Sequence, residues 1–213
     1  GFARNGQYEE TLRCFKQMQN GGISPDAFTF ACVLKACSSI KAQNEGRKAH
    51  AGITGEKGLI ERNIIISTTL VDMYAKCGFI GKAREVFDDI QIRSVVLWNA
   101  LIGGYVQEYQ NYKALNCFQC MQNEGLSPDA TTLTCVLKAC SRLGAFDKGE
   151  EVHVQIVRRR LLQKDVMLGT ALLDMYCKLG AIEKIEDLFD SLSIQDIVSW
   201  TVLISGYATL AML

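Results

Sequence analysis

Cysteine and histidine are the residues of this sequence whose types and spacing come closest to a reactive site. Cys117 and Cys120 have the Cys-x-x-Cys spacing of half a zinc site, which needs a second pair of ligands. His50 and His153 could act as metal ligands or general bases. Neither begins the His-x-Glu signature of zinc deaminases, because glycine and glutamine stand two positions after them. The sequence therefore predicts no metal site, no cofactor and no catalytic residue; stoichiometric zinc in the purified protein would favour an enzyme instead.

The cysteines fit helix packing better than disulfide bonding. Their number is odd, and most lie inside apolar helical patterns rather than in loops. Buried, reduced thiols are expected, and core packing is the interpretation preferred for the Cys-x-x-Cys pair as well. The nine cysteines are Cys14, Cys32, Cys37, Cys77, Cys117, Cys120, Cys135, Cys140 and Cys177.

Positive charge is concentrated locally and not in the chain as a whole. Arg158, Arg159 and Arg160 are consecutive, and they could contact phosphate groups together with Arg47, Lys48 and Lys138. A charge run on a helix is more often a solvated face. With 23 Lys+Arg against 23 Asp+Glu, the net charge is zero, which argues against a protein that binds a polyanion through its overall charge alone. No apolar run reaches the roughly 18–20 uninterrupted residues that span a bilayer, so no membrane partner is expected.

The elements that carry these residues are repeated along the chain. Residues 12–20 recur at 115–123, and Ser24-Pro25-Asp26 recurs as Ser127-Pro128-Asp129, at an offset of 103 residues. Further on, residues 70–74 recur at 172–176, at an offset of 102. Matches in register over such lengths indicate an array of repeated structural units.

Each long copy divides into three helix pairs. Within 95–129, Trp98, Leu101, Ile102 and Tyr105 have the i, i+3, i+4, i+7 spacing of one helix face. A second apolar helix follows, and Gly125 stands where a helix would end. The predicted units are 27–63, 64–94, 95–129, 130–165 and 166–196, with a partial unit at each end, 1–26 and 197–213.

Stacking is what such helix pairs require, because one hairpin cannot bury its apolar face alone. The expected fold is therefore all-α, a right-handed superhelical α-solenoid with a concave inner face. Gly78, Gly144 and Gly180 fit the tight turns between paired helices. Trp98 and Trp200 lie on the apolar helix face and are expected in the core.

The repeats resemble a known family. Residues 98–105 (Trp-Asn-Ala-Leu-Ile-Gly-Gly-Tyr), 125–129 (Gly-Leu-Ser-Pro-Asp) and 70–78 (Leu-Val-Asp-Met-Tyr-Ala-Lys-Cys-Gly) are similar to pentatricopeptide repeats. The alternation of 35, 36 and 31 residues over 95–129, 130–165 and 166–196 resembles the plant subclass with P, long and short triplets. The resemblance implies that 95–129 is a P repeat, that 27–63 and 130–165 are long repeats, that 64–94 and 166–196 are short repeats, and that 1–26 and 197–213 are partial P repeats. The resemblance covers the whole chain and implies sequence-specific binding of single-stranded RNA, one base per repeat.

The resemblance also implies which residues face the RNA. In this family the fifth and last residues of a repeat face the base, and the second residue packs between bases. The implied base-recognition pairs are Asn99 with Asp129, Thr170 with Asp196, Thr68 with Ser94 and Thr134 with Asp165, with Thr201 and Asp26 contributed by the partial repeats. The repeat 27–63 offers Ala31, which cannot hydrogen-bond, with Asn63. The implied base-packing residues are Phe28, Ile65, Val96, Thr131, Met167 and Val198.

Hydrogen-bond chemistry limits the bases that these pairs can take. An ionised Asp only accepts, so Asp129 and Asp196 favour uracil or guanine, whose ring N–H donates, whereas the hydroxyl of Ser94 tolerates adenine or cytosine. The resemblance adds that Asn99 goes with a pyrimidine and that Thr68 and Thr170 go with purines. With protein and RNA parallel, as the resemblance implies, the expected motif is 5′-A-U-x-G-3′, where x falls on the long repeat 130–165.

Two other interpretations stay open. Asn99, Thr68 and Thr170 could be ordinary polar residues of a first helical turn, and Asp129 and Asp196 could be helix N-caps, which is compatible with base recognition. The alternative function is a tetratricopeptide-like protein–protein interaction scaffold, although its constant period of about 34 residues differs from the alternation seen in this sequence.

The wider role is implied by the resemblance alone. It implies the specificity module of an organellar RNA-processing factor or C-to-U RNA-editing factor in a mitochondrion or chloroplast. The partners would be an organellar transcript and other editing factors, with no small-molecule substrate. The sequence begins without methionine or a transit-like segment, so we expect a fragment, with the transit peptide and any deaminase domain outside it.

Overall fold

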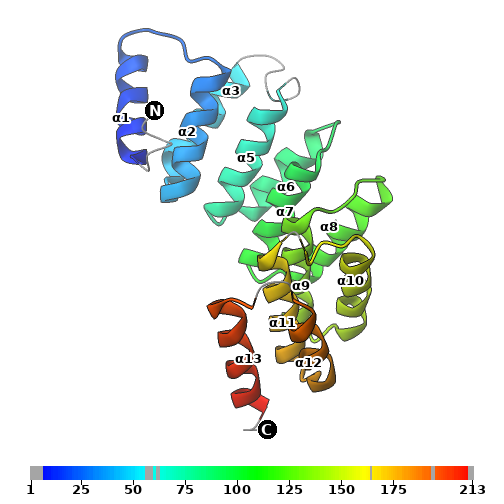
Figure 1. Ribbon diagram of the computed structural model, residues 1–213. Helices are drawn as coiled ribbons and strands as arrows, with labels where there is room; N and C mark the ends of the chain where they lie inside the picture. Colours follow the sequence, from blue (N-terminus) through cyan, green and yellow to red (C-terminus); the bar gives the residue numbers. More distant parts are fainter. Residues whose placement is uncertain (1–6, 56–59, 61–62, 164, 193–194, 211–213) are drawn as a thin grey trace. The chain divides into compact units, whose positions relative to one another are not determined.

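Helices dominate the computed structural model, which describes residues 7–55, 60, 63–163, 165–192 and 195–210. These residues form twelve α-helices and no β-strand (Figure 1). The predicted all-α class is confirmed, and within the described ranges no helix is both long and apolar enough to cross a membrane. The helices are α1 (Tyr8–Asn20), α2 (Ala27–Ile40), α3 (Gln43–Gly55), α5 (Ile64–Lys76), α6 (Ile80–Asp89), α7 (Val95–Gln107), α8 (Asn111–Asn123), α9 (Ala130–Leu143), α10 (Phe146–Arg158), α11 (Val166–Leu179), α12 (Ile182–Ser191) and α13 (Ile197–Leu210).

Six of these, which we call the first helices, start at the residues that open the predicted repeats. They are α2, α5, α7, α9, α11 and α13. The others, α1, α3, α6, α8, α10 and α12, are the second helices. The repeat boundaries themselves stay a prediction, and residues 1–6 and 211–213 of the two partial repeats lie outside the described residues.

The chain divides into two compact units, Gly1–Glu108 and Tyr109–Leu213. In the first unit, α2, α5 and α7 pack side by side, α1 and α3 pack on α2, and α6 packs on α5 and α7 (Figure 1). Fully buried apolar side chains, among them Leu34, Leu70 and Leu101, fill the space between the first helices.

The second unit repeats this plan. Helices α9, α11 and α13 form its layer of first helices, α8 and α10 pack on α9, and α12 packs on α11. Phe118, Leu137, Ile156 and Leu172 are fully buried. Each unit thus has the stacked hairpins of an α-solenoid, because every hairpin buries its apolar face against the next one. The solenoid prediction is confirmed.

Helix ends follow the local chemistry of the sequence. The expected turn glycines Gly78, Gly144 and Gly180 have φ values of 84°, 68° and 72°, a region that a side chain disfavours. In the first copy Lys41 occupies the position of Gly144, and it adopts φ 54° at the end of α2. At the other end, a polar side chain caps each first helix, as described next.

Candidate nucleic-acid interface

The second residue of every first helix points away from the core. The neighbouring third residue is buried in most of these helices, as Ile66, Leu97 and Leu168 show, so the helical turn directs the second residue outward. Five of the six second residues are nevertheless large and apolar. Their exposed fractions are 72% for Phe28, 63% for Ile65, 61% for Val96, 69% for Met167 and 47% for Val198, and Thr131 is exposed as well.

We call these six residues the N-terminal apolar row. Single exposed apolar side chains are ordinary in soluble proteins, but these recur at the same structural position, which makes the row a candidate for a binding surface. Within the first unit the row runs over three adjacent helices, from Phe28 on α2 through Ile65 on α5 to Val96 on α7. Each of these side chains lies close to a helix N-terminus, where the partial positive charge of the helix favours an anion.

The last residue of each repeat caps the first helix that follows. Asp129 Oδ1 accepts the backbone N–H of Thr132 at 2.9 Å, and Asp196 Oδ1 accepts that of Ser199 at 2.8 Å. The N-cap interpretation of these residues is therefore confirmed. The equivalent bonds run from Thr29 N–H to Asp26 Oδ1 at 2.7 Å, Ile66 N–H to Asn63 Oδ1 at 3.2 Å, Leu97 N–H to Ser94 Oγ at 3.2 Å and Leu168 N–H to Asp165 Oδ1 at 3.0 Å.

Capping favours the ionised form of Asp26 and Asp196. Hydrogen bonds from the side chain and the backbone N–H of Thr29 hold the pKa of Asp26 below its ordinary value, and the backbone N–H of Ser199 does the same for the pKa of Asp196. An ionised carboxylate has room for further acceptor bonds because each oxygen carries two lone pairs. A cap can therefore also receive a donor from a bound molecule.

The threonines at the fifth position of the repeats differ in whether their hydroxyl groups already donate a hydrogen bond. Thr170 is only 8% exposed, and its Oγ1 donates to the carbonyl of Val166 at 3.0 Å. Thr201 is exposed and donates to the carbonyl of Ile197 at 2.6 Å. Thr68 and Thr134 are half-buried, and neither hydroxyl has a hydrogen-bond partner among the described residues. Sequence alone could not distinguish these states, because all four residues are threonine.

Each fifth residue lies one turn into a first helix, and its predicted partner caps the next first helix. Thr68 with Ser94 belongs to α5 and α7, which pack together in the first unit; Thr170 with Asp196 belongs to α11 and α13, which pack together in the second. Asn99 lies half-buried on α7 in the first unit, whereas Asp129 caps α9 in the second. The base-facing role of these pairs stays a prediction.

The Cys-x-x-Cys pair, Cys117 and Cys120, does not form part of a metal site among the described residues. Cys117 is buried and Cys120 is exposed. Core packing was thus wrong for Cys120, which lies beside Cys117 at the margin of the buried face that Ala114, Phe118 and Met121 form on α8. Among the described residues no group of three Cys, His, Asp or Glu side chains could hold a metal ion.

The two histidines form a repeated pair that sequence reasoning missed. His50 Nδ1 lies 2.7 Å from the hydroxyl of Tyr74, and His153 Nδ1 lies 2.7 Å from that of Tyr176. Burial lowers the pKa of both histidines. Each pair joins the second helix of a long repeat to the first helix of a short one. The signal was present in the sequence, since both members recur at equivalent positions in the two copies.

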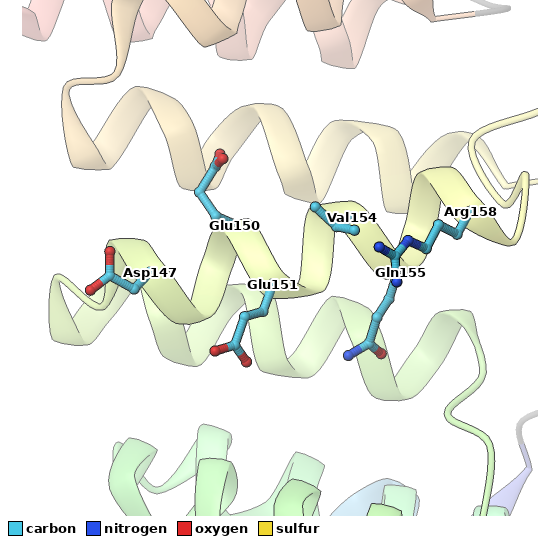
Figure 2. A pocket seen from close by; sticks show the side chains of 6 residues that line it. All are labelled: Asp147, Glu150, Glu151, Val154, Gln155 and Arg158. Atoms are coloured by element: carbon cyan, nitrogen blue, oxygen red, sulfur yellow. The ribbon is translucent and has the colours of Figure 1, made fainter.

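The outer surface of α10 bears a shallow groove built from a single helix (Figure 2). The lining residues are Asp147, Glu150, Glu151, Val154, Gln155 and Arg158. Two of the carboxylates form ion pairs with lysines, Glu150 with Lys184 at 3.2 Å and Glu151 with Lys148 at 2.6 Å. Next to the groove, Arg159 of the basic run donates a hydrogen bond to the carbonyl of Pro128 at 2.5 Å, so its role is structural. The acidic and basic groups of this groove balance, so it has no excess positive charge to attract phosphate, and the first helices are the better candidate for an RNA surface.

The tryptophans divide in the same way as the cysteines. Trp98 is buried, with its ring edge-on to Phe87 at 4.5 Å between centroids. Trp200 makes the equivalent contact with Phe189 at 4.7 Å but stays 47% exposed. Core packing is confirmed for Trp98 only.

Comparison with known proteins identifies the repeats. Sequence models of the PPR repeat family match residues 1–39 and 93–142, and those of the PPR repeat match residues 65–95, 131–161 and 170–193. Two relatives from Arabidopsis thaliana are pentatricopeptide repeat-containing protein At2g33680, 39% identical over 97% of this chain and 28% of that protein, and At5g55740, chloroplastic, 38% identical over 96% of this chain and 24% of that protein. The chain thus spans about a quarter of the length of these relatives.

A solved structure has the same fold. The pentatricopeptide repeat protein PPR10, which is from maize, matches with a TM-score of 0.75 and 20% identity in its complex with an 18-nt psaJ RNA element, over 99% of this chain and 31% of that one. The hairpin order, the capped first helices and the matching sequence models lead to one conclusion: the chain belongs to the pentatricopeptide repeat family.

Proposed function

We propose that this chain binds single-stranded RNA along the N-terminal turns of its first helices, with one nucleotide per repeat. The observation that carries the proposal is the N-terminal apolar row, in which exposed apolar side chains recur beside polar caps. A nucleotide has a flat apolar face and a polar edge, so an apolar residue next to a hydrogen-bonding pair suits it. That PPR10 was solved with an RNA element supports the same choice of ligand.

The short repeat 166–196 fits guanine best. The Thr170 hydroxyl donates its only hydrogen to the carbonyl of Val166, so it can act only as a hydrogen-bond acceptor towards a base. The carboxylate of Asp196 is likewise an acceptor only. Guanine places two adjacent donors, N1–H and the N2 amino group, on its Watson–Crick edge, whereas uracil has one donor there.

The remaining pairs complete a motif. In the repeat 64–94, Ser94 Oγ accepts from Leu97 N–H, which leaves its own O–H free to donate to adenine N1. In the repeat 95–129, Asn99 with Asp129 suits uracil, whose N3–H donates to the carboxylate. We therefore propose the RNA motif 5′-A-U-x-G-3′, read parallel to the chain, with x at the repeat 130–165.

The affinity should be modest. Stacking contributes about 1–3 kcal/mol per base, and aliphatic residues belong at the low end of this range. Roughly five repeats then supply about 5–8 kcal/mol before ordering costs, which corresponds to micromolar binding or weaker.

The biological setting is proposed from the relatives. Some are named chloroplastic and another mitochondrial. The alternating repeat lengths of 35, 36 and 31 residues support the subclass with P, long and short triplets. We propose that the chain is the specificity module, and not itself an enzyme, of an organellar factor for RNA processing or C-to-U editing, with other editing factors as partners.

Fluorescence anisotropy tests the proposal directly. Labelled single-stranded RNAs carrying A-U-x-G and its single-base variants would be titrated with the chain at low and high salt. Preference for the motif, lost when U or G is changed and retained at high salt, is the expected result. Weak binding that ignores sequence and vanishes with salt would mean electrostatic contact only, and capture of peptides without RNA would favour a protein-binding scaffold.

A further inference from the structure

Four residues that line the groove on α10 form a stripe along the helix. Asp147, Glu151, Val154 and Arg158 are all exposed and follow one another at spacings of four, three and four positions. At 100° per residue these positions fall within about 60° of one another, and Figure 2 shows Asp147 at one end of the groove and Arg158 at the other. We propose that these four residues, the α10 stripe, are an interface between two copies of this chain, whose α10 helices pack antiparallel about a two-fold axis.

The α10 stripe has the same spacing when it is read from either end. A two-fold axis through its midpoint therefore places Asp147 at the level of Arg158 of the second copy, and Glu151 at the level of Val154 of the second copy. An isologous interface needs this property, because both copies use the same patch and each residue must meet a different, complementary one. The spacing thus suits the α10 stripe for pairing with itself.

The two ends of the α10 stripe carry opposite charges that are not paired within the chain. Asp147 lies in the first turn of α10 and Arg158 in the last. Neither residue forms an ion pair in the part of the chain that the structure describes. In the antiparallel dimer each Asp147 faces Arg158 of the second copy, so one ion pair forms at each end of the interface and both charges are matched.

An apolar contact lies at the centre of the stripe. Val154 keeps 45% of its surface exposed. In the antiparallel pair the two Val154 side chains are offset by about 4.5 Å along the axis, so they can meet between helices that lie about 8–10 Å apart. Glu151 is also close to the axis, but its carboxylate is paired with Lys148 at 2.6 Å. Its charge is therefore compensated within each copy.

The equivalent groove on α3 lacks this complementarity. Its lining residues are Asn44, Arg47, Lys48 and Ala51, and they include no carboxylate. Asn44 takes the place of Asp147, and Gly55 takes that of Arg158. The same two-fold arrangement on α3 would bring two Lys48 side chains together with no acidic residue of the groove to face them. Self-complementarity is thus a property of α10 and does not follow from the repeat plan.

The dimer should be weak. One helix face is smaller than a standard interface of about 1,600 Å², and exposed ion pairs contribute little each. We expect a Kd on the order of 10–100 µM at low salt. The Kd should rise with salt concentration, because the end pairs are exposed to solvent and are screened.

Analytical ultracentrifugation of the 213-residue chain tests the proposal through charge reversal. Asp147→Arg gives a stripe that is basic at both ends, and Arg158→Asp gives one that is acidic at both ends. Each variant alone should associate about tenfold more weakly than the wild type, because like charges then face each other. An equimolar mixture of the two variants should recover dimers of wild-type affinity, because the basic ends of one face the acidic ends of the other.

Two further variants separate the interface from the stability of the helix. An acid in the first turn and a base in the last turn also stabilise an isolated helix through its dipole. The double variant with Asp147→Arg and Arg158→Asp opposes the dipole but restores both end pairs, so it should unfold more easily and still dimerise like the wild type. Asn44→Arg adds positive charge at the equivalent position of α3 and should leave the Kd unchanged within about twofold. Circular dichroism of each variant checks the helical content.

The result does not depend on the proposed function, because no RNA enters the measurement. A chain that stays monomeric up to about 500 µM would overturn the proposal. So would self-association that neither single variant weakens, since another surface would then be responsible. If the mixture associates no more tightly than each variant alone, Asp147 and Arg158 serve only the helix dipole and the proposed interface is wrong.

Discussion

Asp129 and Thr132 close a reciprocal capping box at the start of α9. The carboxylate oxygen Oδ1 of Asp129 accepts the backbone N–H of Thr132 at 2.9 Å, and Thr132 Oγ1 accepts the backbone N–H of Asp129 at 3.2 Å. The residue proposed to receive the N3–H of uracil therefore also holds the helix end in place. One side chain carries a structural role and a recognition role, and different substitutions should separate them.

Asp129→Asn should change recognition and spare stability. Asparagine caps helices about as well as aspartate, so the free energy of unfolding should move by less than about 0.5 kcal/mol, whereas Asp129→Ala should lose about 1 kcal/mol. The amide nitrogen of asparagine can donate to cytosine N3, so the preference at this repeat should shift from uracil towards cytosine. Urea denaturation and anisotropy with U and C variants measure the two effects.

The comparison is informative in both directions. If Asp129→Ala alters the RNA preference and Asp129→Asn does not, the carboxylate acts only through the helix end. If Asp129→Asn leaves the preference for uracil intact, the assignment of Asp129 to the base is wrong.

Asn99→Thr should move the preference of the repeat 95–129 from uracil to guanine. The physical reason is that the threonine side chain is shorter than that of asparagine and leaves room for the larger purine, while Asp129 still accepts a ring N–H. Competition anisotropy with A-U-x-G against A-G-x-G RNA measures the change. Thr69→Ser is a matched control, because Thr69 lies on a first helix one position beyond the fifth residue and its hydroxyl donates to the carbonyl of Ile65. An unchanged preference for uracil in Asn99→Thr would mean that Asn99 is not the base-recognising residue of this repeat and that the register of the repeats is wrong.

The histidine–tyrosine pairs make stability depend on pH. Burial holds the pKa of His50 and His153 below the ordinary value of 6.5, so the unfolded chain takes up protons at a higher pH than the folded chain. The stabilisation is complete above about pH 6.5 and is lost as pH falls through the window between the ordinary and the lowered pKa. Urea denaturation from about pH 8 to 5 measures this slope.

Variants identify the source of that slope. His50→Gln with His153→Gln should flatten it, because glutamine does not titrate. Asp26 and Asp196, whose pKa values are lowered, contribute their own loss only near and below about pH 4, the ordinary carboxyl range. A slope above pH 5 that persists in the double variant would have to come from other groups.

The sequence predicts the architecture well because the architecture depends on patterns. Apolar spacing within 95–129 places the buried faces of α7 and α8, and Asp129 marks a helix start. Sequence periodicity does not show which group a side-chain hydroxyl donates its hydrogen bond to. Thr134 and Thr170 occupy the same position in their repeats, yet one hydroxyl is free among the described residues and the other is bonded to Val166. Such differences arise from packing between helices, which single-sequence patterns do not encode.

The solvent exposure of some side chains cannot be predicted from the sequence, for a related reason. Cys120 and Trp200 belong to apolar helical patterns, but each lies at the margin of a buried face and stays exposed. The margin of a face is set by the neighbouring helix, whereas its centre is set by the helix itself. Trp98, at the centre of its face, is correctly predicted to be buried.

Gly104 should be the most sensitive glycine of the first unit, since α7 approaches α5 and α6 closely there. A Cβ atom at Gly104 would lie 2.6 Å from Ala75 Cβ and 2.7 Å from Ile80 Cδ1. The Ala75 methyl group is fixed to the backbone and cannot rotate away, so Gly104→Ala should cost about 1–3 kcal/mol of unfolding free energy through overpacking. Gly81→Ala is the matched control: it is also helical, has nothing within 4 Å of the added Cβ, and should gain up to about 1 kcal/mol from helix propensity. Urea denaturation of both variants gives the two values. Equal stability of Gly104→Ala and the wild type would mean that α7 and α5 can separate freely, which would contradict the close packing of the first helices.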